Sequence, residues 1–428
     1  MIADIFKTTT RDSSGHAQAY LSGLLSRIQR KNMERMCESL EDIKHQDMQQ
    51  FLSDSPWESS ELWKWTGKEA SRLLGGGSEN MLLIDESAFA KKGEKSVGVA
   101  RQYNGRLGKV DNCQLGVFSA LTHGNRVALV GARLFLPEEW TKEPQRMIEA
   151  GVPAEHQNYR TRNELAWELI QEAHANEVEF EWVGMDAAYG RDQQLLHKIA
   201  EAGLKFVADV DIRQMVWENK PEGLTRPARV EASGARRVDE LWQEGKSSAV
   251  NRTIRSGENG SVDVRFWSRQ VWIWPSGSEQ PLPVALLVSL RSDGEIKYSL
   301  CNAPKETPKT ELAKRQAQRF FIERAFQDGK SELGMGQYQA RKWRAWGHHM
   351  ALVGAAIVFA LNERIETAAS SPLTSMRDVV EMISWYFLKP RTAADVSNAI
   401  QKRHERRRKV AESKIRKNKK RRKINLTQ

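Results

Sequence analysis

The stretch from Gln316 to Lys330, QAQRFFIERAFQDGK, constrains the fold more than any other part of the sequence. It lacks proline, and its composition predicts a helix over residues 311–333. At 3.6 residues per turn, Arg319, Glu323 and Lys330 fall within roughly 40° of one another on such a helix. Large apolar side chains surround the same face: Phe320, Phe321, Ile322 and Phe326. We therefore expect the helix to be buried nearly all round.

A buried carboxylate on this helix needs a partner. An unpaired buried charge is costly unless a metal ion or a cation lies beside it. Arg319 stands four residues before Glu323, so a simple ion pair on an exposed helix face is one interpretation. The alternative is that other parts of the chain bring further ligands to Glu323.

Two apolar segments end in a carboxylate. Met81 to Ile84 is followed by Asp85, and the strand-like segment Val178 to Met185 is followed by Asp186. Continuous apolar runs of this length are typical of buried central strands, so both acids are expected at strand exits. Each also has a simpler interpretation, Asp85 as a turn residue and Asp186 as a helix cap. Asp209 and Asp211, near the end of a later strand, are weaker candidates.

The elements between the first acid and the helix follow the order β, β, β, α, β, α, β. After the first strand comes a cation-rich segment, Ser87 to Asn112, which we expect to be an extended ribbon or loop. The other predicted elements are strands at 114–121 and 126–136 joined by a hairpin turn, a helix at 161–177, the strand ending at Met185, a short helix and a strand at 204–210. This order predicts an α/β fold with a mixed sheet.

The remaining sequence suggests five segments. Turn signals and alternating apolar residues predict a β-rich insertion before the helix that carries Glu323. The predicted division is an N-terminal helical domain at 1–76, the first part of the catalytic core at 77–211, the β-rich subdomain at 212–308, core helices at 309–362, and a C-terminal helical region with a basic tail at 363–428.

The positive charge of the chain is concentrated at one end. The whole chain carries +11, whereas residues 402–423 hold fourteen Lys or Arg and two Glu, which leaves the rest near −1. Such a block, which includes Arg406, Arg407 and Arg408, is typical of a segment that binds nucleic acid through phosphate contacts. A targeting signal or a disordered tail are the alternatives.

Other compositional features point to a cytoplasmic protein. The first 30 residues contain no apolar stretch of the signal-peptide type, and the longest apolar run, Met350 to Leu361, is too short to span a bilayer. We expect it to be a buried helix. The three cysteines are odd in number and lack metal-ligand spacing, which fits reduced thiols. No membrane partner is expected.

Three carboxylates from two strand ends and a helix can hold two divalent cations about 4 Å apart. Oxygen ligands favour Mg²⁺ or Mn²⁺ over zinc. Such a site positions a water or a 3′-hydroxyl for in-line attack on a phosphodiester. The order of the acids therefore predicts a metal-dependent nuclease or strand-transfer site at Asp85, Asp186 and Glu323.

Four segments carry a resemblance to a known family. LLIDESAFAKKGEKSVGVARQYNGRLGKVDNCQLGVF, RLFLPEEW, GMDAAYG and RFFIERAFQDGKSELGMGQYQARKWRAW resemble bacterial insertion-sequence transposases of the Asp-Asp-Glu class. The resemblance covers roughly residues 15–400. It implies a ribonuclease-H-like catalytic core and cut-and-paste movement of DNA, with Asp85, Asp186 and Glu323 as the metal-binding triad.

The resemblance also implies DNA contacts. The subgroup with a Tyr-x2-Arg-x3-Glu-x6-Lys signature matches at Arg319, Glu323 and Lys330, where the Arg and Lys contact phosphate near the cut. Gln316 stands where that signature has Tyr, although its amide can also donate a hydrogen bond to phosphate. Tyr298 best matches the aromatic residue that stacks on a flipped base during hairpin formation. The cations of the segment after the first strand are further expected DNA contacts: Lys91, Lys92, Arg101 and Arg106.

The sequence thus predicts a DNA transposase with two Mg²⁺ or Mn²⁺ ions in its active site. Its expected partners are double-stranded DNA, as terminal inverted repeats and as target, and a second copy of the chain in a homodimer on DNA. We expect a bacterial, nucleoid-associated protein. A ribonuclease-H-like nuclease without strand transfer and a domesticated transposase acting as a DNA-binding regulator are the alternatives.

Overall fold

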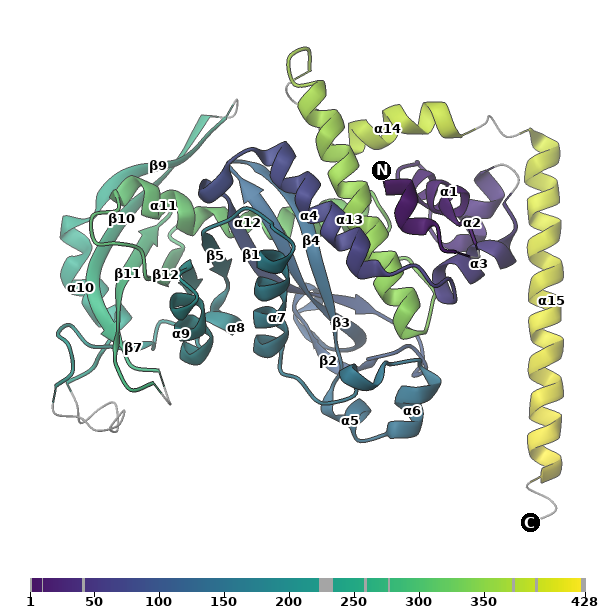
Figure 1. Ribbon diagram of the computed structural model, residues 1–428, viewed down its shortest axis with the longest axis horizontal. Helices are drawn as coiled ribbons and strands as arrows, with labels where there is room; N and C mark the ends of the chain where they lie inside the picture. The colour runs from purple at the N-terminus through teal and green to yellow at the C-terminus, as the bar shows by residue number, and fades with distance from the viewer. Residues whose placement is uncertain are drawn as a thin grey trace.

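The computed structural model describes residues 2–9, 11–40, 43–222, 234–257, 260–275, 278–371, 374–388 and 392–424. A mixed sheet of ten strands runs through the molecule, with helices on both faces and at one end (Figure 1). Its strands are β1 Met81–Ala90, β2 Ala100–Asn104, β3 Lys109–His123, β4 Arg126–Phe135, β5 Trp182–Met185, β6 Lys205–Asp209, β9 Val250–Gly257, β10 Gly260–Ile273, β11 Leu282–Leu290 and β12 Ile296–Cys301. A separate two-stranded sheet pairs β7 Met215–Val216 with β8 Arg236–Arg237.

Five neighbouring strands form the ribonuclease-H-like core, in the order β4-β3-β1-β5-β6. The first three are antiparallel, whereas β1, β5 and β6 run parallel to one another. Helices α7 Arg162–Ala175, α8 Ala187–Gly190 and α9 Gln193–Glu201 provide the crossovers that parallel strands require. The predicted α/β class with a ribonuclease-H-like core is confirmed.

The β-rich segment continues the same sheet. Strand β12 pairs antiparallel with β6, and β11, β10 and β9 follow outward from it. Helix α10 Val238–Gly245 lies beside these outer strands (Figure 1). This continuity brings the outer strands into direct contact with the edge of the catalytic core, and the predicted five-segment division stays a prediction.

The segment Ser87 to Asn112 is partly strand and partly loop, in line with the expected extended ribbon or loop. One expectation about the first core strand is wrong, because β1 extends to Ala90 and Asp85 lies inside the strand, not at its exit. The physical reason is that β3 is long enough to pair with β1 along its whole length, from Met81 with Thr122 to Ala90 with Cys113. The predicted hairpin turn between β3 and β4 is present, and Gly124 adopts a positive φ of 59° there.

Within the described residues, four α-helices precede the sheet, in the segment that was expected to be helical. They are α1 Ser14–Leu24, α2 Met33–Ser39, α3 His45–Ser53 and α4 Ser59–Leu74. Helix α4 ends at Gly75, whose φ of 66° allows the left-handed cap that L-residues rarely adopt. Two short helices, α5 Glu138–Thr141 and α6 Pro144–Glu149, follow β4.

The apolar helix near the C-terminal end lies in the core. Helix α13 Trp343–Glu366 is long and apolar enough to cross a membrane by length and composition, yet 83% of its most apolar 18-residue stretch is buried inside the protein. It packs against α4, α3, α1 and β4. The expected buried helix is confirmed, and it joins the N-terminal helices to the sheet.

The helix predicted over 311–333 is divided at Arg319. Helix α11 Lys309–Gln318 precedes this residue and α12 Phe320–Ser331 follows it. The expectation of burial nearly all round is wrong, because α12 packs with only one side on the sheet and α13, while Phe320 remains 49% exposed. Within the described residues, one face of α12 is therefore exposed.

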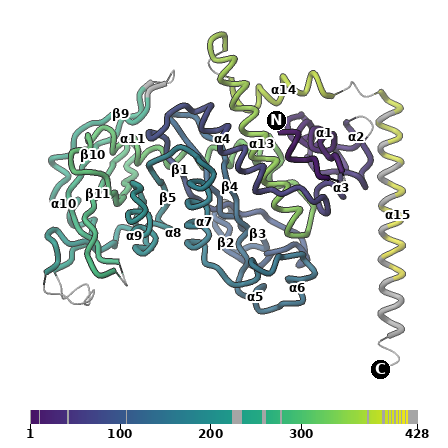
Figure 2. The backbone as a smooth tube through the Cα atoms, viewed as in Figure 1, coloured from purple at the N-terminus to yellow at the C-terminus, as the bar shows by residue number. Residues whose placement is uncertain are grey.

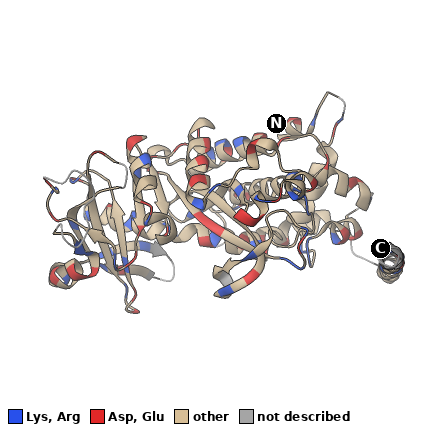
Figure 3. Ribbon diagram, turned by 90° about the horizontal axis from the view of Figure 1, so that it is seen from below, with Lys and Arg blue, Asp and Glu red and all other residues tan. Residues whose placement is uncertain are grey.

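Two further helices end the chain. Helix α14 Met376–Phe387 is followed by α15 Ala393–Ile424, the 32-residue helix that carries the basic block. Helix α15 stands apart from the body of the molecule in two perpendicular views (Figures 2 and 3). The basic block is therefore helical in this structure.

Candidate active site

Three aspartates lie level with one another at one edge of the parallel strands. Ile84 pairs with Met185, and Met185 pairs with Ala208, so the next residues on these strands are Asp85, Asp186 and Asp209. Neighbouring strands are about 4.8 Å apart, which brings the three side chains to one place. The pairing register of β1 with β5 and of β5 with β6 therefore accounts for the placement of the three aspartates.

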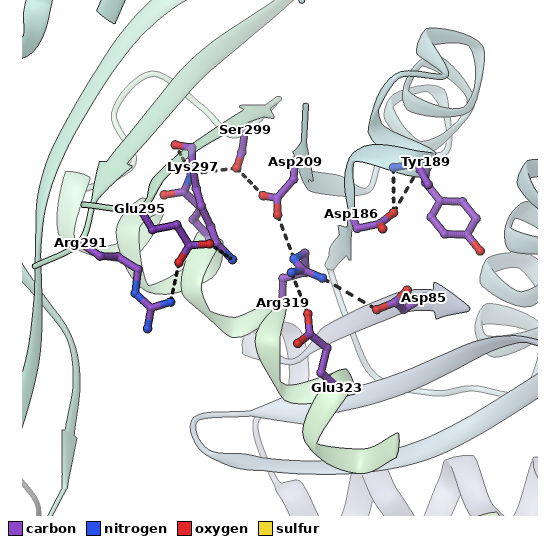
Figure 4. A network of polar contacts seen from close by, with 12 residues as sticks. Asp85, Asp186, Tyr189, Asp209, Arg291, Glu295, Lys297, Ser299, Arg319 and Glu323 are labelled. Carbon is purple, nitrogen blue, oxygen red and sulfur yellow. Dashed lines mark hydrogen bonds and ion pairs between the residues drawn. The ribbon is translucent and has the colours of Figure 1, made fainter. Parts of the chain in front are cut away.

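Asp186 also caps the short helix α8. Its Oδ1 accepts hydrogen bonds from the backbone N–H groups of Ala188, at 2.9 Å, and Tyr189, at 3.4 Å. The helix-cap interpretation is therefore correct in its geometry. The cap leaves the second carboxylate oxygen of Asp186, Oδ2, without a part in it, so Asp186 can cap α8 and also belong to the cluster (Figure 4).

Arg319 connects Glu323 to the strand acids. Its Nη2 donates to Glu323 Oε1 at 2.9 Å, its Nε lies 2.9 Å from Asp209 Oδ2, and its Nη1 lies 3.8 Å from Asp85 Oδ2 (Figure 4). The expected ion pair between Arg319 and Glu323 thus exists. The helix α12 brings both residues over the strand ends, so the ion pair and the larger cluster occur together.

Asp209 was expected only as a weaker candidate, and Ser299 was not expected at the site. Ser299 Oγ donates to Asp209 Oδ1 at 2.6 Å, and Gln316 Nε2 donates to Ser299 Oγ at 2.8 Å. Asp209 ends an apolar strand in the same way as Asp186, and that signal could have raised its rank. Ser299 had no comparable signal, since its contact depends on the pairing of β12 with β6.

The cluster carries more negative than positive charge. Burial, and then the nearby carboxylate of Asp186, raise the pKa of Asp85 to about 7. Burial also raises the pKa of Asp209, although Arg319 acts against it. Burial would lower the pKa of Arg319, but the acids around it, Asp209 first, raise it. These directions show carboxylates that lack sufficient positive charge around them.

The donor set suits a divalent cation. Within the described residues, no three His, Cys, Asp or Glu side chains lie close enough together to hold a metal ion, because the guanidinium of Arg319 lies between Asp209 and Glu323. The chemistry nevertheless fits Mg²⁺ or Mn²⁺, since all available ligands are carboxylate oxygens. The raised pKa of Asp85 is the effect that an additional cation would reverse.

Two expected phosphate contacts are engaged inside the protein. Lys91 Nζ donates to the Tyr338 carbonyl at 3.2 Å and lies 3.3 Å above the Tyr338 ring. Lys330 Nζ lies 3.3 Å from the Ala88 carbonyl oxygen, on the strand that carries Asp85. Lys330 therefore belongs to the neighbourhood of the site, whereas Lys91 points into the core.

Tyr298 and Gln316 lie on opposite faces of the sheet. Gln316 contacts Ser299, and Tyr298 is the residue before Ser299 on β12, so its side chain points the other way. The Tyr298 side chain is buried, with 6% exposed. A stacking role for this ring would require the residues that cover it to move.

The other expected DNA contacts are distributed over the surface. Lys92, Arg101, Arg407 and Arg408 are exposed, and Arg408 Nε lies 3.8 Å from Glu412 Oε1. The side chains of Arg106 and Arg406 lie outside the described part of the structure. The four described side chains are not part of the carboxylate cluster.

A groove of about 880 Å³ adjoins the cluster. It lies between α11, the start of α12 and strands β9 to β12, and Gln316 is part of its wall. Four cations line it: Arg255, Arg291, Lys297 and Lys314. Two of them, Arg291 and Lys297, share the carboxylate of Glu295. This groove was not expected from the sequence.

The fold and the cluster define a ribonuclease-H-like protein with three aspartates level with one another on its adjacent parallel strands. A family model described as "DDE superfamily endonuclease" matches residues 3–261, and the chain belongs to this family. The match includes Asp85, Asp186 and Asp209, while Glu323 lies beyond it.

A comparison with curated proteins gives a more specific similarity. The chain is 26% identical over 326 residues to "Probable transposase for insertion sequence element IS701" from Microchaete diplosiphon. The aligned part covers 74% of each chain. The family and this relative support an enzyme of the transposase type with nuclease chemistry.

Proposed function

We propose that this protein is a DNA transposase that cuts the ends of its element and joins the freed 3′-hydroxyl to target DNA. The observation that supports this most directly is that Asp85 and Asp186 lie level on adjacent parallel strands, while Arg319 links Asp85 to Glu323 of the helix that follows. The similarity to the insertion-sequence transposase adds the expected substrate class.

Asp85, Asp186 and Glu323 would hold two Mg²⁺ or Mn²⁺ ions. When bound, such ions lower the pKa of an attacking water or hydroxyl and stabilise the charge that develops on the phosphate. The protein's own residues orient the reactants. Arg319 and Lys330 present cationic groups close to the acids, where they would grip the phosphates that flank the reacting one.

A DNA strand that leaves the site would bind along the basic groove. Arg255 and Lys314 supply positive charge along it, and Phe320 exposes an aromatic ring at its wall. Helix α15 adds exposed cations on a separate element. The proposed partners are double-stranded DNA with terminal inverted repeats, target DNA, and a second copy of the chain in a homodimer on DNA.

The runner-up function is a nuclease of the same fold that cuts without strand transfer. The same acids would serve it, so the site alone does not separate the two. The presence of all three triad acids argues against the third alternative, a regulator that only binds DNA. The two enzyme functions differ in their products, since only the transposase joins the donor end to a second DNA.

The test uses a labelled DNA carrying one end of the element, a supercoiled target plasmid and Mg²⁺. We expect nicking followed by joined products, and loss of nearly all cleavage in Asp85→Asn, Asp186→Asn and Glu323→Gln, because metal-binding acids act as a unit. Asp211→Asn is the matched control: it also follows β6, but it hydrogen-bonds the backbone of Arg213. Retained cleavage in any triad variant would reject the assignment. Nicks without joined products would favour the nuclease.

A further inference from the structure

The contacts of Arg319 divide into two kinds. Glu323 and Asp85, at 2.9 and 3.8 Å, belong to the triad proposed to bind metal ions. Asp209, at 2.9 Å, does not. The Arg319 side chain is only 13% exposed, so these acids replace most of its contact with water.

Asp209 is held in place from its other side. Its Oδ2 contacts Arg319, while its Oδ1 accepts the hydrogen bond of Ser299 Oγ at 2.6 Å. Gln316 donates in turn to Ser299, from the last turn of α11, three residues before Arg319. Ser299 (Figure 4), held in turn by Gln316, thereby orients the carboxylate of Asp209 toward Arg319.

This arrangement gives Arg319 a partner that does not depend on the triad. Divalent cations and Arg319 would bind the same carboxylates, those of Glu323 and Asp85. Binding of a cation would therefore weaken the contacts of Arg319 with these acids, and these contacts would weaken cation binding. A guanidinium that lost all its partners in this buried place would be costly. Asp209 removes that cost, because its contact with Arg319 persists when the triad is engaged elsewhere.

We propose that Arg319 is an internal counter-ion of the carboxylate cluster and that Asp209 is its positioning residue. Divalent cations displace Arg319 from Glu323 and Asp85, and Asp209, oriented by Ser299, keeps the guanidinium at the site to face a substrate phosphate. The proposal rests on the proposed function, since it takes the triad as the metal-binding group. It adds a competition between Arg319 and the metal, and a role for two residues outside the triad.

The first test measures Mn²⁺ binding to the metal-free full-length protein by calorimetry, without DNA. Arg319→Gln should bind Mn²⁺ about tenfold more tightly, because a competing charge-assisted contact is removed. The same variant should cleave end DNA more slowly at saturating Mn²⁺. Arg324→Gln is the matched control on the same helix, where it pairs with Asp328, and both measurements should match the wild type.

The second test changes the orientation of the Asp209 carboxylate without removing its charge. Ser299→Ala removes only the hydroxyl that orients the carboxylate. Single-turnover cleavage at saturating Mn²⁺ should fall by about threefold, with Mn²⁺ affinity within about twofold of the wild type. The loss should vanish in an Arg319→Gln background, since Ser299 acts through Arg319. Ser119→Ala, at another buried serine of the sheet, is the control.

The outcomes separate this inference from the proposed function. Weaker Mn²⁺ binding in Arg319→Gln would overturn the counter-ion role. A clear loss of Mn²⁺ affinity in Ser299→Ala would overturn the positioning role and make Asp209 a metal ligand. If Arg319→Gln binds Mn²⁺ more tightly but the wild type cuts no DNA, the proposed function fails while the counter-ion role stands.

Discussion

Tyr20 and His349 join the N-terminal helices to the core through a buried hydrogen bond, with Tyr20 Oη 2.8 Å from His349 Nδ1. His349 Nε2 lies 3.2 Å from the Met335 carbonyl oxygen, which can only accept. The hydrogen of the neutral ring is therefore on Nε2, and Nδ1 accepts from the Tyr20 hydroxyl. Helix α1 and helix α13 are held together by a residue that must remain uncharged.

This contact predicts acid sensitivity. Burial lowers the pKa of His349 from 6.5 to about 3, so between these values the unfolded chain binds a proton that the folded chain does not. Stability should therefore fall as the pH falls below about 6.5. We expect His349→Gln, which keeps one donor and one acceptor, to reduce the loss in unfolding free energy between pH 6.5 and 5 by about 2 kcal/mol. Urea unfolding at several pH values measures this.

The exposed histidine of helix α7 provides the control for that experiment. His174→Gln replaces a histidine whose side chain is exposed, and its pH series is measured beside that of His349→Gln. If His349→Gln keeps the full wild-type slope, the acid sensitivity has another origin. His348, whose pKa burial lowers to about 4, would then be the next residue to replace.

Two adjacent lysines should differ in their effect on DNA binding. Lys91 lies against Tyr338, and burial lowers its pKa to about 7, whereas Lys92 is exposed. Lys91→Met should leave DNA affinity within about twofold. Lys92→Met should weaken binding and lower the slope of log K against log salt by about 0.9, the value for one phosphate contact. Fluorescence anisotropy over a salt series measures both variants. Equal losses of DNA affinity in the two would contradict the prediction that only Lys92 contacts DNA.

The proximity of Asp85 and Asp186 could be predicted because apolar strands followed by acids leave a local signal in the sequence. Asp85 and Asp186 each follow a continuous apolar run, and the parallel pairing of those runs then brings them together. Glu323 could be linked to Arg319 because four residues make one helical turn. The apolar run before an acid and the four-residue spacing of an ion pair can both be recognised in a short stretch of sequence.

The contacts made by the outer strands could not be predicted in this way. The link from Gln316 through Ser299 to Asp209 depends on β12 lying next to β6, a pairing between residues about 90 positions apart. Alternation shows that Tyr298 and Ser299 face opposite sides, but not which side faces the helix. The burial of α12 was overestimated for a related reason, since an apolar count does not show how many elements pack on a helix.

The basic helix α15 should add affinity that is independent of sequence. Its exposed cations stand on an element apart from the body of the protein (Figure 2). Each phosphate contact steepens the salt dependence by about 0.9, so removal of residues 402–428 should flatten the slope by several units. Preference for element ends over random DNA should change little, because phosphate contacts position a protein without specifying sequence. An unchanged slope would assign the tail another role.

Tyr298 tests how the second DNA strand is cut. Its buried ring predicts that Tyr298→Ala lowers the unfolding free energy by about 3 kcal/mol, while Tyr298→Phe changes it little. If the ring also becomes uncovered and stacks on a flipped base, it should contribute about 1 to 3 kcal/mol to holding that base. We then expect Tyr298→Ala to slow hairpin formation while first-strand nicking stays near normal, and Tyr298→Phe to support both steps.

A denaturing gel of a labelled end substrate over time separates the two steps, at a temperature where all variants are folded. Gln316 donates to Ser299 in this structure, so hairpin formation would also need it to exchange that partner for a phosphate. The stacking role of Tyr298 fails if the wild type forms no hairpin, or if Tyr298→Ala slows both steps equally, as loss of packing alone would. Trp267 and Trp272 lie on β10, which is separated from β12 by β11, and Trp274 follows β10; these would then be the next aromatic residues to replace.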